Sequence, residues 1–344
     1  MYLLWFTGAL MRLFGVSGID AASLVIIKFV PMVFDMGAIW LLWKLARKQL
    51  GETTAVALAA LYAFSPAILV DGAIWGQVDA VIAFGLLLTV SLVMNKKWMA
   101  ALPVYIVTVL MKPQALMAGP LGLVALILDI FPWKENGKKT LKDAAIGLGI
   151  GIGIAAAMLL PFVWGKESPI GWIIEHYTES MTGYPNATIN AANLYYMLGA
   201  NWAPLTDALG PFTYQQWGTA LMVIIVAGTV AMFAVRRERA LLPFFGAMAY
   251  IGLFVFGIMM HERYLFPALI LLLLAYIKRR DWRLLAMFVG YSITFFMNCA
   301  ALLPDQHLPG GFNLGWAIVA GVNILLYGLG IWMMFDKKVR MLPK

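Results

Sequence analysis

The sequence predicts an all-α polytopic membrane protein, and three features of the chain support this fold class. Of the 344 residues, 62% are hydrophobic and 12% are charged, whereas a soluble domain is about half apolar and about a quarter charged. The mean hydropathy is +0.85, and apolar runs that approach the length needed to cross about 30 Å of hydrocarbon recur along the chain. Basic residues are concentrated in every second loop. We therefore expect a single transmembrane domain over residues 1–344.

Eleven apolar segments are candidate transmembrane helices, because a backbone that crosses lipid must satisfy its own hydrogen bonds. Several are shorter than a full span, so short or re-entrant helices are expected among them. The segments are 22–43, 53–70, 80–94, 99–111, 114–131, 143–163, 217–235, 240–258, 264–277, 284–303 and 314–335.

The basic loops hold 20 of the 25 lysines and arginines. By the positive-inside rule these loops and the C-terminus face the cytoplasm, as expected for a multi-pass protein of the plasma membrane. Because the net charge of +8 comes from these short loops, no nucleic-acid partner is expected. Their basic residues are Lys44, Arg47, Lys48, Lys96, Lys97, Lys134, Lys138, Lys139, Lys142, Arg236, Arg237, Arg239, Lys278, Arg279, Arg280, Arg283, Lys337, Lys338, Arg340 and Lys344.

Several chemistries find no support in the sequence. Cys299 is the only cysteine, which excludes an internal disulfide and a cysteine-based metal site. The motifs H-E-x-x-H, G-x-x-x-x-G-K-[ST] and G-x-S-x-G are missing, so zinc proteolysis, ATP use and acyl hydrolysis are not indicated. No cofactor and no metal ligand are assigned, although a divalent cation stays an open alternative.

The one long outer loop, residues 164–216, is expected to hold short interfacial helices. Its segment 170–177 places apolar and polar residues on opposite faces of a helix, which suits the headgroup layer. Farther along, Asn193 lies near Tyr195 and Trp202. Amides and aromatic rings together suit a sugar, which has hydroxyl edges and apolar faces. An aromatic belt at the lipid–water interface is the alternative interpretation.

A first polar cluster, Asp71–Asp79, joins two apolar segments on the predicted outer side. Gln77 and Asp79 can reach one ligand together from a turn, with Trp75 beside them. A carboxylate here can hold sugar hydroxyls, bind a cation or accept a proton. The alternative is a helix-capping aspartate next to a tryptophan of the interfacial belt.

A second cluster, Lys112-Pro113-Gln114, lies at the same predicted membrane level. Proline ends the helix, and the ammonium group is placed to meet a lipid phosphate. A lysine that only extends its charge to the interface is the alternative.

The third cluster, His261-Glu262-Arg263-Tyr264, lies between two strongly apolar segments. Arginine binds phosphate through two parallel hydrogen bonds, and histidine can donate one more. An interfacial Glu–Arg ion pair without a ligand is the alternative.

The motifs W-G-Q-V-D (Trp75–Asp79), K-P-Q (Lys112–Gln114) and H-E-R-Y-L-F-P (His261–Pro267) occur in this order on one predicted face. Together they resemble motifs of the prokaryotic relatives of the GPI-anchor mannosyltransferases, a family of the glycosyltransferase C superfamily. The resemblance covers nearly the whole chain, roughly residues 1–335.

The resemblance implies a glycosyltransferase C-like architecture and an inverting hexosyltransferase of the outer membrane face, with mannose the commonest sugar. It implies a polyprenyl-phosphate sugar as donor, a sugar, lipid or protein as acceptor, and contact with membrane lipid. Lys112, His261 and Arg263 are then expected to bind the donor phosphate. The expected substrate-binding residues are Trp75, Gln77, Gln114, Glu262, Tyr264 and Asn193.

The sequence departs from the family pattern at its start. The pattern begins with one further span and an outer loop that carries an acidic catalytic base, whereas Met1–Trp5 resembles the helix that follows this loop. We therefore expect the first span and the usual base to be missing, and assign the catalytic carboxylate to Asp79. A secondary transporter or lipid flippase, and an inactive or non-catalytic membrane subunit, are the competing hypotheses.

Overall fold

The computed structural model describes residues 2–18, 20–131, 133, 135–305, 307–336 and 338–341. Met1, Lys134, Lys337 and Lys344, which enter the expectations above, lie outside the described residues. Helices account for most of the chain, and strands are confined to four pairs of residues in the described part. The strands are β1 (Thr188–Ile189), β2 (Ala208–Leu209), β3 (Phe212–Thr213) and β4 (Met260–His261).

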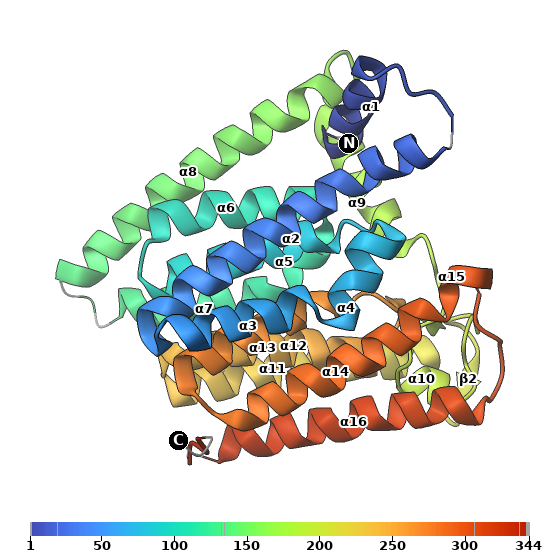
Figure 1. The fold of residues 1–344 in the computed structure, drawn as a ribbon. Coiled ribbons are helices and arrows are strands. Elements are labelled where there is room, and N and C mark those ends of the chain that lie inside the picture. The colour runs from blue at the N-terminus through green and yellow to red at the C-terminus, as the bar shows by residue number, and fades with distance from the viewer. Residues whose placement is uncertain are drawn as a thin grey trace.

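The helices follow the apolar segments of the sequence (Figure 1). In the first half they are α1 (Tyr2–Leu13), α2 (Ala21–Leu50), α3 (Glu52–Ala63), α4 (Pro66–Ile68), the π-helix η1 (Leu69–Trp75), α5 (Asp79–Met94), α6 (Trp98–Met111), the 3-10 helix η2 (Pro113–Ala118) and α7 (Gly119–Ile130). In the second half they are α8 (Glu135–Val163), α9 (Pro169–Thr182), α10 (Leu194–Met197), α11 (Tyr214–Arg236), the 3-10 helix η3 (Arg239–Leu241), α12 (Leu242–Phe256), α13 (Phe266–Arg279), α14 (Trp282–Ala300), α15 (Leu302–Asp305) and α16 (Leu314–Phe335).

The prediction of an all-α, multi-pass membrane protein is confirmed at this level. Among the described residues, seven helices are long and apolar enough to cross a membrane. An eighth span results if α3 and the α4–η1 segment, bent by 43° at their junction, are counted as one. Every predicted segment falls on a helix, but the count of eleven spans stays a prediction.

The centre of the bundle is formed by short helices. All residues of α13 from Phe266 to Ile277 are buried, and most of α5 is buried as well. At 1.5 Å per residue, the 14 residues of α13 extend about 21 Å, less than the hydrocarbon thickness. Because α13 and α5 are buried on nearly all sides, the sequences of these two helices are apolar all round and lack a polar face.

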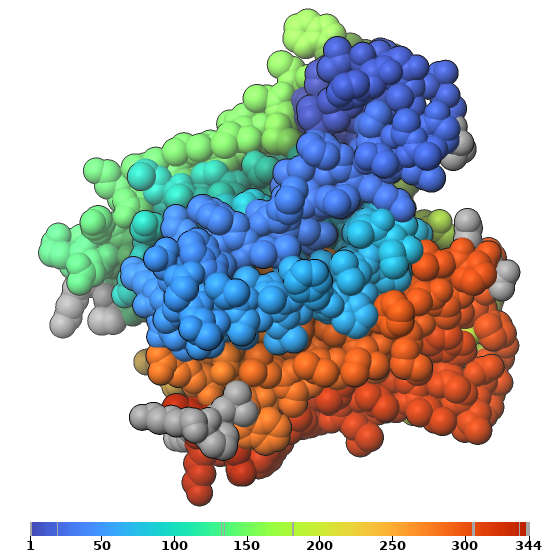
Figure 2. Space-filling view, viewed as in Figure 1, coloured from blue at the N-terminus to red at the C-terminus, as the bar shows by residue number. Residues whose placement is uncertain are grey.

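Long helices cover the outside of the bundle. The 29-residue α8 exposes Ile146, Ile150 and Ile152 along its length. Figure 2 shows α14 and α16 side by side along another face. So many exposed large apolar side chains are typical of helices that face lipid rather than water.

The bundle has two chemically different ends. The basic end holds the last turns of α2 and the segments around 95–97, 236–239, 279–283 and 338–341. There Arg236 donates to the Met334 carbonyl at 2.9 Å, and Arg283 pairs with Asp336 at 2.7 Å. The site end, opposite to it, holds residues 76–79, 112–114, 184–204 and 257–264. Since α5, α6, α12 and α13 all run between these two ends, the three polar motifs of the sequence come to lie together.

Asp129, at the basic-end terminus of α7, joins two of these segments, the one around 95–97 and the one around 236–239. Its carboxylate accepts a hydrogen bond from Trp98 Nε1 at 2.8 Å and lies 3.6 Å from Lys96 Nζ. It also pairs with Arg239, which in turn donates to the Val93 carbonyl. The Asp129 side chain is only 4% exposed, so these contacts stabilise a charge that burial disfavours.

We expect Asp129→Ala to lower the free energy of unfolding by about 1–3 kcal/mol, because it leaves the buried Trp98 Nε1 without its partner and leaves Arg239 only the Val93 carbonyl. The measurement is the thermal unfolding midpoint of the purified protein in detergent. Glu135→Ala is the matched control, since Glu135 pairs with Lys138 at 3.4 Å while 92% exposed. Glu135→Ala should lower the free energy of unfolding by less than about 1 kcal/mol. Equal losses of unfolding free energy in the two variants would contradict the stabilising role of Asp129.

Candidate active site at the lipid–water boundary

The site begins at the turn between η1 and α5. Gly76 ends η1 with φ +83°, a left-handed conformation that side chains other than glycine's rarely adopt. The chain reversal at Gly76 lets the backbone N–H of Gln77 donate a hydrogen bond to the Asp71 carbonyl at 2.9 Å. Asp79 then becomes the first residue of α5 and is fully buried. A carboxylate at a helix N-terminus is stabilised by the helix dipole.

Lys112 forms an ion pair with Asp79 across the start of α5. It follows α6 in an extended conformation, φ −156° and ψ 120°, which is the backbone that a residue before proline prefers. Lys112 Nζ lies 2.5 Å from Asp79 Oδ1. The lysine also lies 5.7 Å from the centroid of the Tyr264 ring.

Arg263 approaches the same carboxylate from the turn between β4 and α13. Its Nε lies 3.8 Å from Asp79 Oδ2, and its Nη1 lies 2.7 Å from Glu262 Oε1. The guanidinium also lies 5.9 Å from the Trp75 ring. We call Asp79, Lys112, Glu262 and Arg263 the charged cluster; each of its carboxylates is at most 3% exposed.

His261 lies beside the charged cluster but does not pair with it closely. Its Nδ1 is 3.9 Å from Glu262 Oε2, and its ring packs edge-on against Tyr184 at 5.0 Å. Burial, together with the positive charges of Arg263 and Lys112, lowers the pKa of His261 to about 3. The imidazole is therefore neutral at physiological pH.

The remaining residues of the sequence-based assignment lie in two places. Gln114 is buried next to the charged cluster and donates from Nε2 to the Tyr264 carbonyl at 2.9 Å. Gln77 is half-buried in the turn before Asp79. Asn193 is fully buried elsewhere, where its side chain caps α10 and its Nδ2 donates to the Gly257 carbonyl at 3.4 Å. The structure thus gathers the three motifs but leaves Asn193 outside the cluster.

Asp71 is a functional candidate that the sequence assignment omitted. It is fully buried, and neither carboxylate oxygen has a hydrogen-bond partner among the described residues. Asp35 lies close to Gly72, the residue after Asp71. Its Oδ2 is 2.6 Å from the point where a Cβ atom on Gly72 would stand. A carboxylate at the end of an apolar run was the available signal, since such groups are costly unless they have a function.

An apolar cavity of about 360 Å³ opens beside the turn that carries Asp79. It lies between α1, α2, α6, α8 and α9, and includes Gly76, Val78 and Pro113 in its wall. These three residues flank Gln77, Asp79 and Lys112 in the sequence. The cavity therefore adjoins the turn before Asp79 and the residue after Lys112, while its wall is formed by neighbours of the charged cluster and not by the cluster itself.

Both carboxylates of the charged cluster lie close to cationic side chains. Within the part of the chain that the structure describes, no three histidine, cysteine or acidic side chains are arranged to hold a metal ion. The carboxylates are instead placed against Lys112 and Arg263, so the cluster can exchange an internal partner for an anionic group of a ligand.

The lowered pKa of His261 predicts a pH dependence of stability. Between the folded value of about 3 and the ordinary value of 6.5, the unfolded chain binds the additional proton. The stability linked to His261 is therefore complete above about pH 6.5 and declines as the pH falls toward 3. We expect His261→Gln to flatten the fall in unfolding midpoint between about pH 6.5 and 4.

The measurement is a series of thermal scans at fixed ionic strength. His176→Gln serves as the control, because His176 lies exposed on α9. If the slopes of wild type and His261→Gln coincide over this range, His261 does not carry the dependence.

Comparison with known proteins adds no relative to this picture. No protein-family model matches the sequence, and no curated protein matches it. A functional assignment therefore depends on the residues at the site end and on their geometry.

Proposed function

We propose that this chain is a membrane glycosyltransferase that moves a hexose from a polyprenyl-phosphate donor to an acceptor at the outer membrane face. Mannose is the sugar to test first, because the three sequence motifs resemble those of the mannosyltransferase family described above. The acceptor is a sugar, a lipid or a protein.

The observation that carries this proposal is the convergence of Lys112 and Arg263 on one buried carboxylate. The two cations come from different motifs, 151 positions apart, and lie 2.5 Å and 3.8 Å from the oxygens of Asp79. Two cations at a lipid–water boundary suit a diphosphate or phosphate headgroup. The adjoining apolar cavity suits the hydrocarbon chain of the same donor.

The proposed reaction is a direct displacement at the anomeric carbon. A bond forms between the acceptor oxygen and that carbon, while the bond from the carbon to the phosphate oxygen breaks. The phosphate leaves with the electron pair, and a carboxylate of the protein takes the acceptor's proton. Lys112 and Arg263 stabilise the negative charge that grows on the phosphate.

Asp79 accepts the proton only if its cations are drawn away. In the structure Lys112 Nζ lies 2.5 Å from Asp79 Oδ1, so this oxygen already has a partner. A bound donor phosphate would compete for Lys112 and Arg263 and so leave an oxygen of Asp79 open to the acceptor hydroxyl. Asp71 is the second candidate, because its oxygens have no hydrogen-bond partner among the described residues.

The finer points of the architecture belong to the same proposal. They are eleven spans in a glycosyltransferase C-like arrangement, a plasma-membrane location and a cytoplasmic C-terminus. The segregation of basic loops at one end of the bundle and of the charged cluster at the other supports this orientation.

A secondary transporter is the second candidate function, and one observation favours it. The α3 and α4–η1 helices are bent by 43° where the chain breaks, and the π-helix after the break carries the buried Asp71. Transporters often hold ions at such interrupted helices. Uptake of a solute by proteoliposomes, with no sugar transfer, would favour this function.

We expect Lys112→Ala, Arg263→Ala and Asp79→Asn each to lower sugar transfer by about 10²-fold or more, because each removes a charge that the transition state needs. Purified protein is supplied with a polyprenyl-phosphate hexose, and transfer is measured as turnover number. Lys166→Ala is the control; Lys166 contacts Trp172 at 5.3 Å, away from the charged cluster, and its loss should leave transfer unchanged.

A folding defect is separated from a catalytic one by the double variant Lys112→Met/Asp79→Asn. This variant removes both charges of the ion pair, so it leaves no unpaired lysine or aspartate there and should fold. Wild-type transfer in all three single variants would refute the site assignment.

Asp71→Asn is expected to change activity and stability in opposite directions. Removal of a buried carboxylate without a hydrogen-bond partner should leave the unfolding midpoint unchanged or higher. If Asp71 takes the acceptor's proton, turnover should fall by about 10²-fold or more. Wild-type turnover in Asp71→Asn would leave Asp79 as the only base candidate of this pair.

A further inference from the structure

Two helices of the bundle hold the outer loop through side-chain amides. Asn298 of α14 donates from Nδ2 to the Asn190 carbonyl at 2.7 Å, and its Oδ1 accepts from the Ala192 amide at 2.8 Å. Asn323 of α16 donates from Nδ2 to the Ala192 carbonyl at 2.9 Å. Asn298 and Asn323 are each 1% exposed. A buried amide is costly unless it is bonded, so these contacts fix the loop strongly to the helices.

The bonded segment of the loop also forms a small parallel sheet with the turn that carries His261. In this sheet Thr188 is paired with Met260, and Ile189 with His261. Asn190 forms one further bridge with His261, and Thr188 Oγ1 lies 3.4 Å from the Met260 carbonyl. Asn298 therefore binds the backbone directly beside the residues that pair with the turn.

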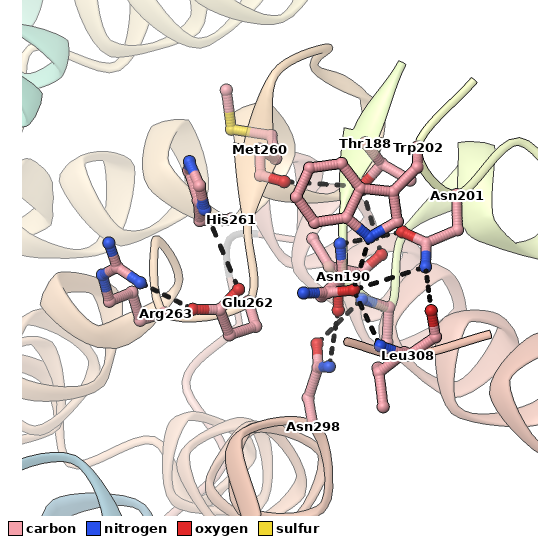
Figure 3. A network of polar contacts seen from close by, with 12 residues as sticks. Thr188, Asn190, Asn201, Trp202, Met260, His261, Glu262, Arg263, Asn298 and Leu308 are labelled. Carbon is pink, nitrogen blue, oxygen red and sulfur yellow. Dashed lines mark hydrogen bonds and ion pairs between the residues drawn. The ribbon is translucent and has the colours of Figure 1, made fainter. Parts of the chain in front are cut away.

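Figure 3 shows the contacts that join Asn190 to Asn201, Trp202 and Leu308. Asn190 has φ +58°, a left-handed conformation in which asparagine is favoured among residues that carry a side chain. Its Oδ1 accepts from the Leu308 amide at 3.0 Å and from Trp202 Nε1 at 2.9 Å. Asn201 Oδ1 accepts a hydrogen bond from the backbone N–H of Asn190 at 2.8 Å.

The covalent chain continues from this pairing directly into the charged cluster. His261 is followed by Glu262 and Arg263, whose Nε lies 3.8 Å from Asp79 Oδ2. Asn298 of α14 is bonded to residues 190 and 192, and the same loop segment is paired with His261. The position of His261 in turn sets the position of the Arg263 backbone two residues later. A shift at one step would be passed to the next, because the steps are two hydrogen bonds of 2.7 and 2.8 Å at Asn298, the backbone pairing of the small sheet, and the peptide bonds from His261 to Arg263.

We propose that Asn298 is a positioning residue, which holds the His261–Arg263 turn in place through the loop segment 188–192. The segment is then a fixed platform for the cluster and not a lid that opens. The catalytic part of this inference rests on the proposed glycosyltransferase function, whereas the structural part does not. Misplacement of a catalytic group by about 1 Å can cost about 10²-fold in rate.

The test compares Asn298→Leu with Ser292→Ala. Both residues lie on α14 and are buried, but the Ser292 hydroxyl has no hydrogen-bond partner among the described residues. Amide hydrogen exchange is followed by mass spectrometry in peptides that cover 186–204 and 257–265. We expect Asn298→Leu to speed exchange in both peptides by about 10-fold or more while α12 and α13 stay protected. Ser292→Ala should match wild type.

Transfer kinetics supply the second measurement. Asn298→Leu should lower kcat by about 10-fold to 10²-fold with KM for the donor within about 2-fold, because the misplaced Arg263 acts on the transition state. Asn323→Leu loses one bond to the same segment and should show a smaller effect in both measurements. It also replaces Asn298→Leu if that variant does not fold.

The two measurements separate the possible failures. Faster exchange in 186–204 with unchanged exchange in 257–265 would overturn the inference, since the loop and the turn would then be independent. Faster exchange in both with an unchanged kcat would overturn the positioning role. Absence of transfer in the wild type would refute the proposed function, while the exchange data would still decide the structural part.

Discussion

The ion pair between Asp79 and Lys112 is the interaction on which the site end depends. A fully buried carboxylate must be neutralised, and the nearest cations come from the end of α6 and from the turn before α13. The pair therefore fixes where these helices end relative to α5. The ion pair also explains why the helix interruptions at Gly76, at Pro113 and at the turn after β4 lie side by side. Each interruption places one charged side chain at the same depth in the bundle.

Much of this arrangement was predictable from the sequence, because it follows from patterns along the chain. Apolar runs located the helices, and the alternation of basic loops placed Lys112, Asp79 and Arg263 at one end. The residues that hold the loop were not predictable in this way. Asn298 binds a segment 108 positions earlier, and an asparagine inside an apolar run gives no sign of its partner. The cap formed by Asn193 was likewise not predicted: its local pattern indicated a sugar contact, which stays a prediction, and the structure shows its side chain at the start of α10.

The two ends of the bundle use their charges differently. At the basic end, Arg283 binds Asp281 at 2.6 Å and Asp336 at 2.7 Å, and it also donates to the Lys338 carbonyl. At the site end, Asp79 Oδ2, Arg263 Nε and both oxygens of Asp71 lack a hydrogen-bond partner among the described residues. Satisfied networks stabilise a fold, whereas a buried charged group without a hydrogen-bond partner is costly and is expected to have a function. Charged residues thus hold the bundle together at the basic end, and at the site end they are the groups that the proposed function uses.

This difference explains why the site end needs a neutral scaffold. In the proposed function a donor phosphate replaces Asp79 as the partner of Lys112 and Arg263, so the turn must then be held by contacts that the phosphate does not change. Amide pairs such as Asn190–Asn201 and Asn298–Asn190 carry no net charge and do not titrate, so a bound anion leaves them unchanged. Under the proposed function the chain therefore separates two tasks: charged groups at the cluster bind the donor phosphate, and uncharged amides beside His261 hold the backbone from which those groups extend.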